Sequence, residues 1–155
     1  MMRTTAALAA CLLTSPAWAQ QPAVDHLSQA GLLTKAQQLE VQAAQSGSAT
    51  QKLAEYPNHF TMISLRKQSG AAEVHQKYAD VFFVVRGRAT LVTGGTVVNL
   101  TTASPGDIRG TSIEGGAQIT LNKGDIVHIP ANVPHQLLLA AHKEFVYFVV
   151  KVQEQ

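Results

Sequence analysis

Two histidines and two carboxylates are the residues of this chain best suited to hold a metal ion. Glu73 and His75 stand two positions apart, Asp80 follows them, and His135 lies far downstream. Because successive side chains of a β-strand point to opposite faces, Glu73 and His75 would project to the same side of a strand. Imidazole nitrogens and carboxylate oxygens are common ligands of divalent first-row metals. The pattern predicts a metal site inside a β-barrel.

The stretch from residue 59 onward, which carries these four residues, has the composition of an all-β protein. Short runs rich in Val, Ile, Phe and Thr are separated by Gly, Asn and Pro. The predicted strands span residues 60–66, 72–77, 81–85, 89–93, 96–100, 118–121, 125–129, 135–139 and 145–152. Many short strands without alternating helices indicate an antiparallel sandwich or barrel.

Glycine-rich segments separate several of these strands. Gly94-Gly95 lies between two runs and predicts a hairpin turn, and Gly115-Gly116 suggests a second one. Residues 100–110 contain Ser-Pro-Gly and predict a loop insertion.

The strand that begins at Asp80 indicates how the barrel is covered. Phe82 and Val84 share the face of Asp80, whereas Phe83 and Val85 point the other way. Because both faces are apolar, we expect this strand to be buried on both sides. An N-terminal helix or a second subunit would cover the outer face.

The first nineteen residues have the pattern of a secretory signal peptide. Arg3 supplies a positive region, residues 6–13 an apolar run, and residues 17–19 a cleavage site of small residues around a tryptophan. We therefore expect a mature chain that starts near Gln20 and is secreted, most simply into the bacterial periplasm.

A lipobox-like sequence offers an alternative to this cleavage. Leu8-Ala-Ala-Cys11 resembles the site at which bacterial lipoproteins are cut and lipidated, but the short apolar run before it favours cleavage after Ala19. That cleavage would also remove Cys11, the only cysteine of the chain. A mature protein without disulfides would depend on packing or metal for its stability.

The charge balance excludes several classes of partner. Removing Arg3 from the 12 Lys and Arg leaves 11, against 10 Asp and Glu. A mature net charge near +1 predicts no nucleic acid partner and, after signal cleavage, no membrane partner. The apolar run at residues 6–13 is too short for a spanning helix, which needs about 20 apolar residues.

Residues 20–57 predict a short helical extension. A helix over residues 35–45 would have Thr34 as its N-cap and Gly47 just beyond its end. A further helical turn over residues 50–55 would end before Pro57. The predicted organisation is a signal peptide at 1–19, an N-terminal helical extension at 20–57 and one β-barrel domain at 58–155.

The spacing of the candidate ligands resembles two motifs of the cupin superfamily. In the first motif the matching positions are Glu73, His75, Asp80 and Gly87. The second motif matches residues 124–139, which include His135. Residues 60–152 thus resemble a small single-domain cupin of the type-2 kind. The resemblance implies an all-β fold, a cupin-type jelly-roll β-barrel, here with a short N-terminal helical segment.

This sequence departs from the cupin motifs at several positions. Glu73 replaces the first histidine, Asp80 replaces the glutamate, and Leu139 replaces the closing asparagine. Lys67 stands where the first motif would have its leading glycine. Asn132 replaces a glycine of the second motif, but asparagine tolerates the left-handed conformation of a tight turn, so we expect that turn to persist.

These departures leave more than one ligand set open. If Glu73, His75, Asp80 and His135 all bind, two carboxylates would neutralise a divalent ion, and oxygen-rich ligation favours iron, manganese or zinc. Alternatively, Glu73 is a catalytic general base, and the other three form the two-histidine, one-carboxylate set of non-haem iron enzymes. A third reading is a degenerate site without metal. The cost of burying uncompensated carboxylates favours metal over this reading.

The resemblance implies several functions and selects none of them. An exported, metal-binding cupin would act on or bind a small organic acid, phenol or sugar, as a metal-dependent dioxygenase, isomerase or lyase. The alternatives are a non-catalytic ligand-binding or sensing module of the periplasm and a purely structural barrel. Lys77 would either contact an anionic group at the barrel mouth or remain solvated. The resemblance also implies a homodimer.

Overall fold

The structure of the protein is a computed structural model that describes residues 24–154. The predicted signal peptide at 1–19, with both cleavage alternatives, lies outside the described residues. Within the described part of the chain, no helix is long and apolar enough to cross a membrane.

Residues 24–154 form two short helices followed by twelve strands. The helices are α1 (Gln29–Gln38) and α2 (Glu40–Ser46). The strands are β1 (Ser48–Glu55), β2 (His59–Arg66), β3 (Ala72–His75), β4 (Tyr78–Thr93), β5 (Thr96–Val98), β6 (Thr101–Ser104), β7 (Asp107–Gly110), β8 (Ser112–Glu114), β9 (Ala117–Asn122), β10 (Ile126–Ile129), β11 (His135–Leu138) and β12 (Phe145–Gln153).

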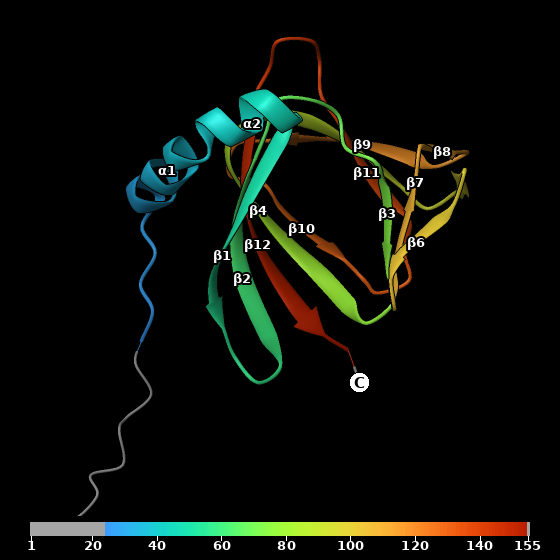
Figure 1. Ribbon diagram of the computed structural model, residues 1–155, viewed down its shortest axis with the longest axis horizontal. Helices are drawn as coiled ribbons and strands as arrows, with labels where there is room; N and C mark the ends of the chain where they lie inside the picture. The colour runs from blue at the N-terminus through green and yellow to red at the C-terminus, as the bar shows by residue number, and fades with distance from the viewer. Residues whose placement is uncertain (1–23, 155) are drawn as a thin grey trace, which may run out of the picture.

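The strands curl into a barrel with two walls that share β4 (Figure 1). The first wall has the order β1-β2-β12-β4-β10, and the second has the order β9-β4-β11-β3-β7-β6. All of these pairings are antiparallel, as the sequence predicts for a barrel. Residues 78–87 of β4 pair with β12, and residues 88–93 pair with β9.

The chain bends from one wall to the other at Gly87. Gly87 has a φ of 88°, and a Cβ at this position would collide with the carbonyl oxygen of Glu144. Only glycine therefore fits where β4 changes partner. The prediction of two separate strands at 81–85 and 89–93 was wrong, because this glycine bends the ladder without ending it.

The predicted helical turn at residues 50–55 is also wrong, because these residues belong to β1. β1 pairs with β2 at the edge of the first wall, with Thr50 opposite Ser64. The Thr50 and Ser64 hydroxyls share a hydrogen bond of 2.7 Å. Pairing with β2 supplies hydrogen bonds that an isolated helical turn would lack, so tertiary context decides the conformation.

The N-terminal helix begins earlier than its sequence pattern predicts. Ser28 is the N-cap, because its hydroxyl accepts a hydrogen bond from the backbone N–H of Gly31. Thr34 lies inside α1, where its hydroxyl donates to the carbonyl of Ala30. The helical segment is divided near Leu39 into α1 and α2, and α2 ends at Gly47 in the left-handed conformation.

The predicted loop at residues 100–110 forms a β-hairpin instead. β6 and β7 pair with each other across a turn that contains Gly106 at a φ of 88°. The predicted hairpins at Gly94-Gly95 and Gly115-Gly116 were wrong. Thr93 pairs with Ala117 and Thr96 with Glu114, so the two glycine pairs face each other within one long two-stranded arm.

Two apolar cores pack on opposite faces of the first wall. The inner core fills the barrel and includes Phe82 and Val84. The outer core joins Val85 and the partly buried Phe83 to α1 and α2. The sequence prediction that β4 is buried on both sides is confirmed, and the N-terminal helices provide the outer cover.

We expect truncation of the helix side chains to test this cover. Leu32 on α1 is 4% exposed, whereas Val41 on α2 is 73% exposed. Leu32→Ala should lower the free energy of unfolding by about 2–5 kcal/mol, while Val41→Ala should change it by less than about 0.5 kcal/mol. Urea denaturation measures both variants, and equal effects would contradict the packing of α1 on the barrel.

Candidate metal centre

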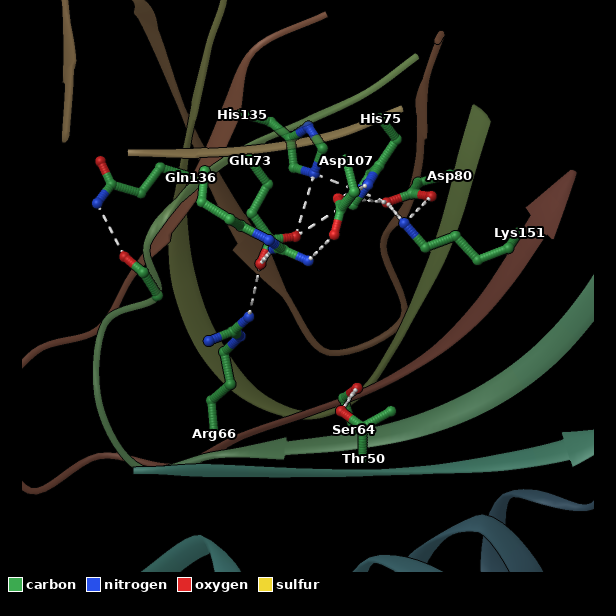
Figure 2. A network of polar contacts seen from close by, with 12 residues as sticks. Thr50, Ser64, Arg66, Glu73, His75, Asp80, Asp107, His135, Gln136 and Lys151 are labelled. Atoms are coloured by element: carbon green, nitrogen blue, oxygen red, sulfur yellow. Dashed lines mark hydrogen bonds and ion pairs between the residues drawn. The ribbon is translucent and has the colours of Figure 1, made fainter. Parts of the chain in front are cut away.

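Three strands bring the four predicted metal ligands into the barrel interior (Figure 2). Glu73 and His75 lie on β3, Asp80 lies near the start of β4, and His135 begins β11. His135 pairs directly with Glu73 across β11 and β3. This register explains how a residue so distant in sequence joins the other three.

The donor atoms of three residues lie at the spacing that one metal ion requires. Ligand atoms of Glu73, His75 and His135 all lie within 4.8 Å of one another. Oε2 of Glu73 is 3.3 Å from Nε2 of His75 and 3.8 Å from Nε2 of His135. Metal–ligand bonds of about 2.0–2.2 Å place neighbouring donors roughly 3–3.5 Å apart. A small adjustment would therefore let all three reach a common ion.

Both imidazoles are oriented with one nitrogen held and the other directed inward. Nδ1 of His75 lies 2.8 Å from Oδ1 of Asp107, and Nδ1 of His135 lies 3.0 Å from the carbonyl oxygen of Val133. Since a carbonyl only accepts, Nδ1 of His135 donates and its Nε2 keeps a lone pair. Burial lowers the pKa of His135, which favours the neutral ring that metal binding needs.

The two Nε2 atoms are the strongest sign that the site fits a metal. Both are buried, and neither has a hydrogen-bond partner among the described residues. Buried polar atoms without partners are rare, because their loss of hydration is not offset. A divalent ion would satisfy the Nε2 atoms of His75 and His135 together.

Glu73 divides its two carboxylate oxygens between cations and imidazoles. Oε1 forms an ion pair with Arg109 and lies 3.6 Å from Nη2 of Arg66. Burial alone would raise the pKa of Glu73, but the nearby imidazole of His75 and the positive charges of Arg109 and Arg66 outweigh it and lower the pKa to about 2. Glu73 is therefore an anion at neutral pH.

Asp80 reaches the same place but already has a strong partner. Nζ of Lys151 lies 2.6 Å from Oδ1 and 2.7 Å from Oδ2 of Asp80. Oδ2 also lies 3.6 Å from Nε2 of His75 and 3.7 Å from Nε2 of His135. Asp80 is thus near enough to become a fourth ligand, but Lys151 competes with the ion for its carboxylate.

Four charged residues around the donors were not predicted from the sequence, and Lys151 is the most buried of them. Lys151 is the single charged residue of the apolar strand β12. A lone charge in an apolar strand could have been recognised from the sequence. Asp107 and Arg109 lie on β7 opposite His75 and Glu73. They were missed because residues 100–110 were predicted to be a loop, which gives its side chains no defined direction. Nothing local singled out Arg66, at the end of β2.

The resulting cluster is balanced in charge before any metal is added. Its three carboxylates and three cations are Glu73, Asp80 and Asp107, with Arg66, Arg109 and Lys151. With neutral imidazoles, the formal charge of these groups sums to zero. From the sequence, a metal is expected to compensate the carboxylates, whereas the protein's own cations already do so. A divalent ion would leave the cluster with a charge of +2.

A cavity leads from solvent to these residues. The inner cavity, of 150 Å³, is lined by Glu73, His75 and Asp80 among others. An outer cavity of 280 Å³ shares His75 and Lys151 with it and includes Lys77 in its lining. Larger hollows of 600 and 640 Å³ lie beside the loop at residues 139–144 and share no residue with the donor cluster. The inner cavity therefore borders Glu73, His75 and Asp80, whereas His135 borders a separate small cavity of 10 Å³ that also touches Glu73.

Comparison with known structures identifies the fold of this chain. No protein-family model matches it, and no curated protein sequence does either. The structure of KdgF from Halomonas sp. is similar, with a TM-score of 0.51, 14% identity, and coverage of 70% of this chain and 82% of that one. An uncharacterised conserved protein with a double-stranded β-helix domain from Klebsiella pneumoniae has a TM-score of 0.50, 17% identity, and coverage of 68% and 76%.

A third similar structure is the DMSP lyase DddQ from Ruegeria pomeroyi. Its TM-score is 0.51 at 16% identity, and the match covers 70% of this chain and 48% of the lyase. These similarities, together with the curled antiparallel walls, show that the chain has the cupin-type double-stranded β-helix fold. The predicted all-β jelly-roll barrel with a short N-terminal helical segment is confirmed.

We expect the Lys151–Asp80 pair to be essential for the stability of the metal-free protein. Lys151→Met would leave the carboxylate of Asp80 buried without its partner, which should cost about 3–5 kcal/mol of unfolding free energy. Urea denaturation in the presence of a chelator measures this loss. Adding Asp80→Asn to Lys151→Met should restore part of it, because the unpaired charge is then removed.

A surface ion pair provides the matched control for that measurement. Lys52 and Glu55 pair at 2.9 Å with side chains that are 51% and 68% exposed. Lys52→Met should leave the stability nearly unchanged, because exposed pairs contribute little. A Lys151→Met variant as stable as Lys52→Met would contradict the buried pair.

Proposed function

We propose that this protein binds a divalent metal ion inside the barrel through Glu73, His75 and His135 and acts there on a small organic molecule. One observation carries the proposal: two buried imidazoles direct Nε2 atoms without hydrogen-bond partners toward one carboxylate oxygen. Two nitrogen donors with carboxylate oxygen favour iron, manganese or zinc among the common ions. Asp80 is the candidate fourth ligand once Lys151 releases it.

Residues around such a metal centre would have separate roles. When bound, the ion would act as a Lewis acid on an oxygen group of the ligand. Asp107 and the Val133 carbonyl hold the two imidazole rings in place. Lys151 lines both cavities and can hold a proton on Nζ beside the bound molecule.

The electrostatics of Glu73 favour a ligand role over a base role. A general base works best when its pKa lies near the working pH. The pKa of Glu73 is lowered to about 2, so its carboxylate is a weak base at neutral pH. Glu73 therefore serves better as a ligand than as a catalytic base.

Several reaction classes suit such a centre. The substrate would be a small organic acid, phenol or sugar, and the reaction a dioxygenation, isomerisation or elimination. The similarity to a structure named as a DMSP lyase supports lyase chemistry on this fold. Export to the bacterial periplasm and a homodimer also belong to the proposal, on the grounds of residues 1–19 and of the cupin resemblance.

A non-catalytic binding module is the second candidate, and one observation favours it. The three carboxylates and three cations of the cluster balance without a metal. The barrel could then hold an organic ligand by hydrogen bonds and ion pairs alone. Metal content and turnover distinguish this module from the metal-dependent enzyme.

Metal titration of selected variants tests the proposal. Calorimetric titration of chelator-treated protein with Mn²⁺ and Zn²⁺ should show one ion per chain. His135→Asn and Glu73→Gln should weaken binding by more than the roughly 10–100-fold typical of losing a supporting partner. His128→Asn, which changes an exposed histidine outside the cluster, should bind like the unmodified protein.

Two results, one from this titration and one from an activity assay of the same variants, would count against parts of the proposal. Equal affinity of His135→Asn and His128→Asn would exclude the metal site. A Glu73→Gln variant that keeps the ion but loses turnover would assign Glu73 to the base role instead of the ligand role.

A further inference from the structure

Arg66 is the cation of the cluster with the most unused hydrogen-bonding capacity. Its side chain is 16% exposed, and it reaches from β2 toward Glu73 in the barrel interior (Figure 2). Among the described residues its guanidinium makes one hydrogen bond, from Nε to the Tyr147 hydroxyl at 3.0 Å. The contact with Glu73, at 3.6 Å, is too long for a hydrogen bond. A guanidinium carries five N–H donors, so most of them are available.

The other two cations of the cluster are already engaged. Arg109 pairs through Nη1 with Glu73 and through Nη2 with Asp107, the latter at 2.9 Å. Lys151 contacts both oxygens of Asp80. Arg66 alone therefore offers a largely free fork of donors to the inner cavity, which it lines.

The position of this fork is fixed before any ligand arrives. Tyr147 holds Nε, and the backbone of Gly70 passes close to the other side, since a Cβ there would lie 2.7 Å from Nη1 of Arg66. A glycine at residue 70 thus leaves the space that the guanidinium occupies. A donor group held in place loses less conformational entropy when it binds an anion.

The net positive charge of the metal-bound cluster favours an anionic ligand. The carboxylates and cations of the cluster already cancel, so a divalent ion would raise the net charge to +2 in a buried place. An anion bound beside Arg66 would reduce this charge. A planar carboxylate matches the guanidinium fork with two parallel hydrogen bonds.

The shape of the inner cavity limits the size of this anion. Its 150 Å³ equals the volume of about five water molecules. The hydroxyls of Thr50, Ser64 and Tyr147 add polar groups to the same lining. Arg66 and the imidazole donors lie on opposite sides of the Glu73 carboxylate, so a short molecule can reach both.

We propose that Arg66 is the carboxylate receptor of the inner cavity, and that the ligand is a small aliphatic carboxylic acid with a second oxygen group. The carboxylate lies on the guanidinium of Arg66, and the second oxygen group faces the donor cluster. This assignment rests on the proposed function, because the metal gives the second oxygen group its partner.

Calorimetric titration of the Mn²⁺-loaded protein with lactate, malonate and succinate tests the assignment, and lactamide serves as the neutral counterpart of lactate. At least one carboxylate should bind, and lactate should bind at least about tenfold more tightly than lactamide. Arg66→Gln should weaken carboxylate binding about 10–100-fold, leave lactamide unchanged and retain the metal. Arg86→Gln, at a 38% exposed side chain that pairs with Glu144 outside both cavities, should bind like the unmodified protein.

Three results would overturn the assignment. They are the absence of binding by all three carboxylates, equal binding of lactate and lactamide, and an Arg66→Gln variant that binds carboxylates like Arg86→Gln. If Arg66→Gln does not fold, Arg66→Lys keeps the charge without the fork and should still lose affinity. If the unmodified protein takes up no Mn²⁺, the proposed function fails. The same carboxylate titrations of the metal-free protein then decide the role of Arg66.

Discussion

The carboxylate of Glu73 holds together the groups on which the interior of this barrel depends. One oxygen contacts Arg109 and lies near Arg66, and the other faces the Nε2 atoms of both histidines. These four partners come from β7, β2, β3 and β11, so both walls of the barrel meet at one side chain. A shift of any of these strands by one residue would turn its contributing side chain to the opposite face. The cluster can therefore form only if each of these strands keeps its register.

Glu73 stands where the cupin motif has a histidine, and this difference changes the electrostatics of the whole barrel interior. A histidine at this place could remain neutral, whereas a carboxylate needs a positive partner once it is buried. Arg66 and Arg109 supply that charge to Glu73, and Lys151 supplies it to Asp80. The carboxylates have thus been accommodated by cations of the protein itself. An ion at this place would add positive charge, which links metal binding to the uptake of an anion.

Local sequence patterns predicted the barrel and the four candidate ligands but not their surroundings. Alternating apolar residues marked most strands, and the motif spacing located His135 beside Glu73. The strands β1 and β7 were missed because their residues are polar, and their conformation depends on pairing with β2 and β3. Asp107, Arg109 and Arg66 were missed for the same reason, since their roles follow from register, which short-range patterns do not encode. Lys151 could have been found, as the one charge in an apolar strand.

Elemental analysis of the protein, purified without chelators, tests most directly whether this cluster is a metal centre. We expect a single manganese, iron or zinc ion per chain. Removal of the ion should lower the melting temperature, because a ligand that binds only the folded state stabilises it. Protein that contains no stoichiometric metal, and whose melting temperature is the same with and without chelator, would contradict the metal centre at Glu73, His75 and His135.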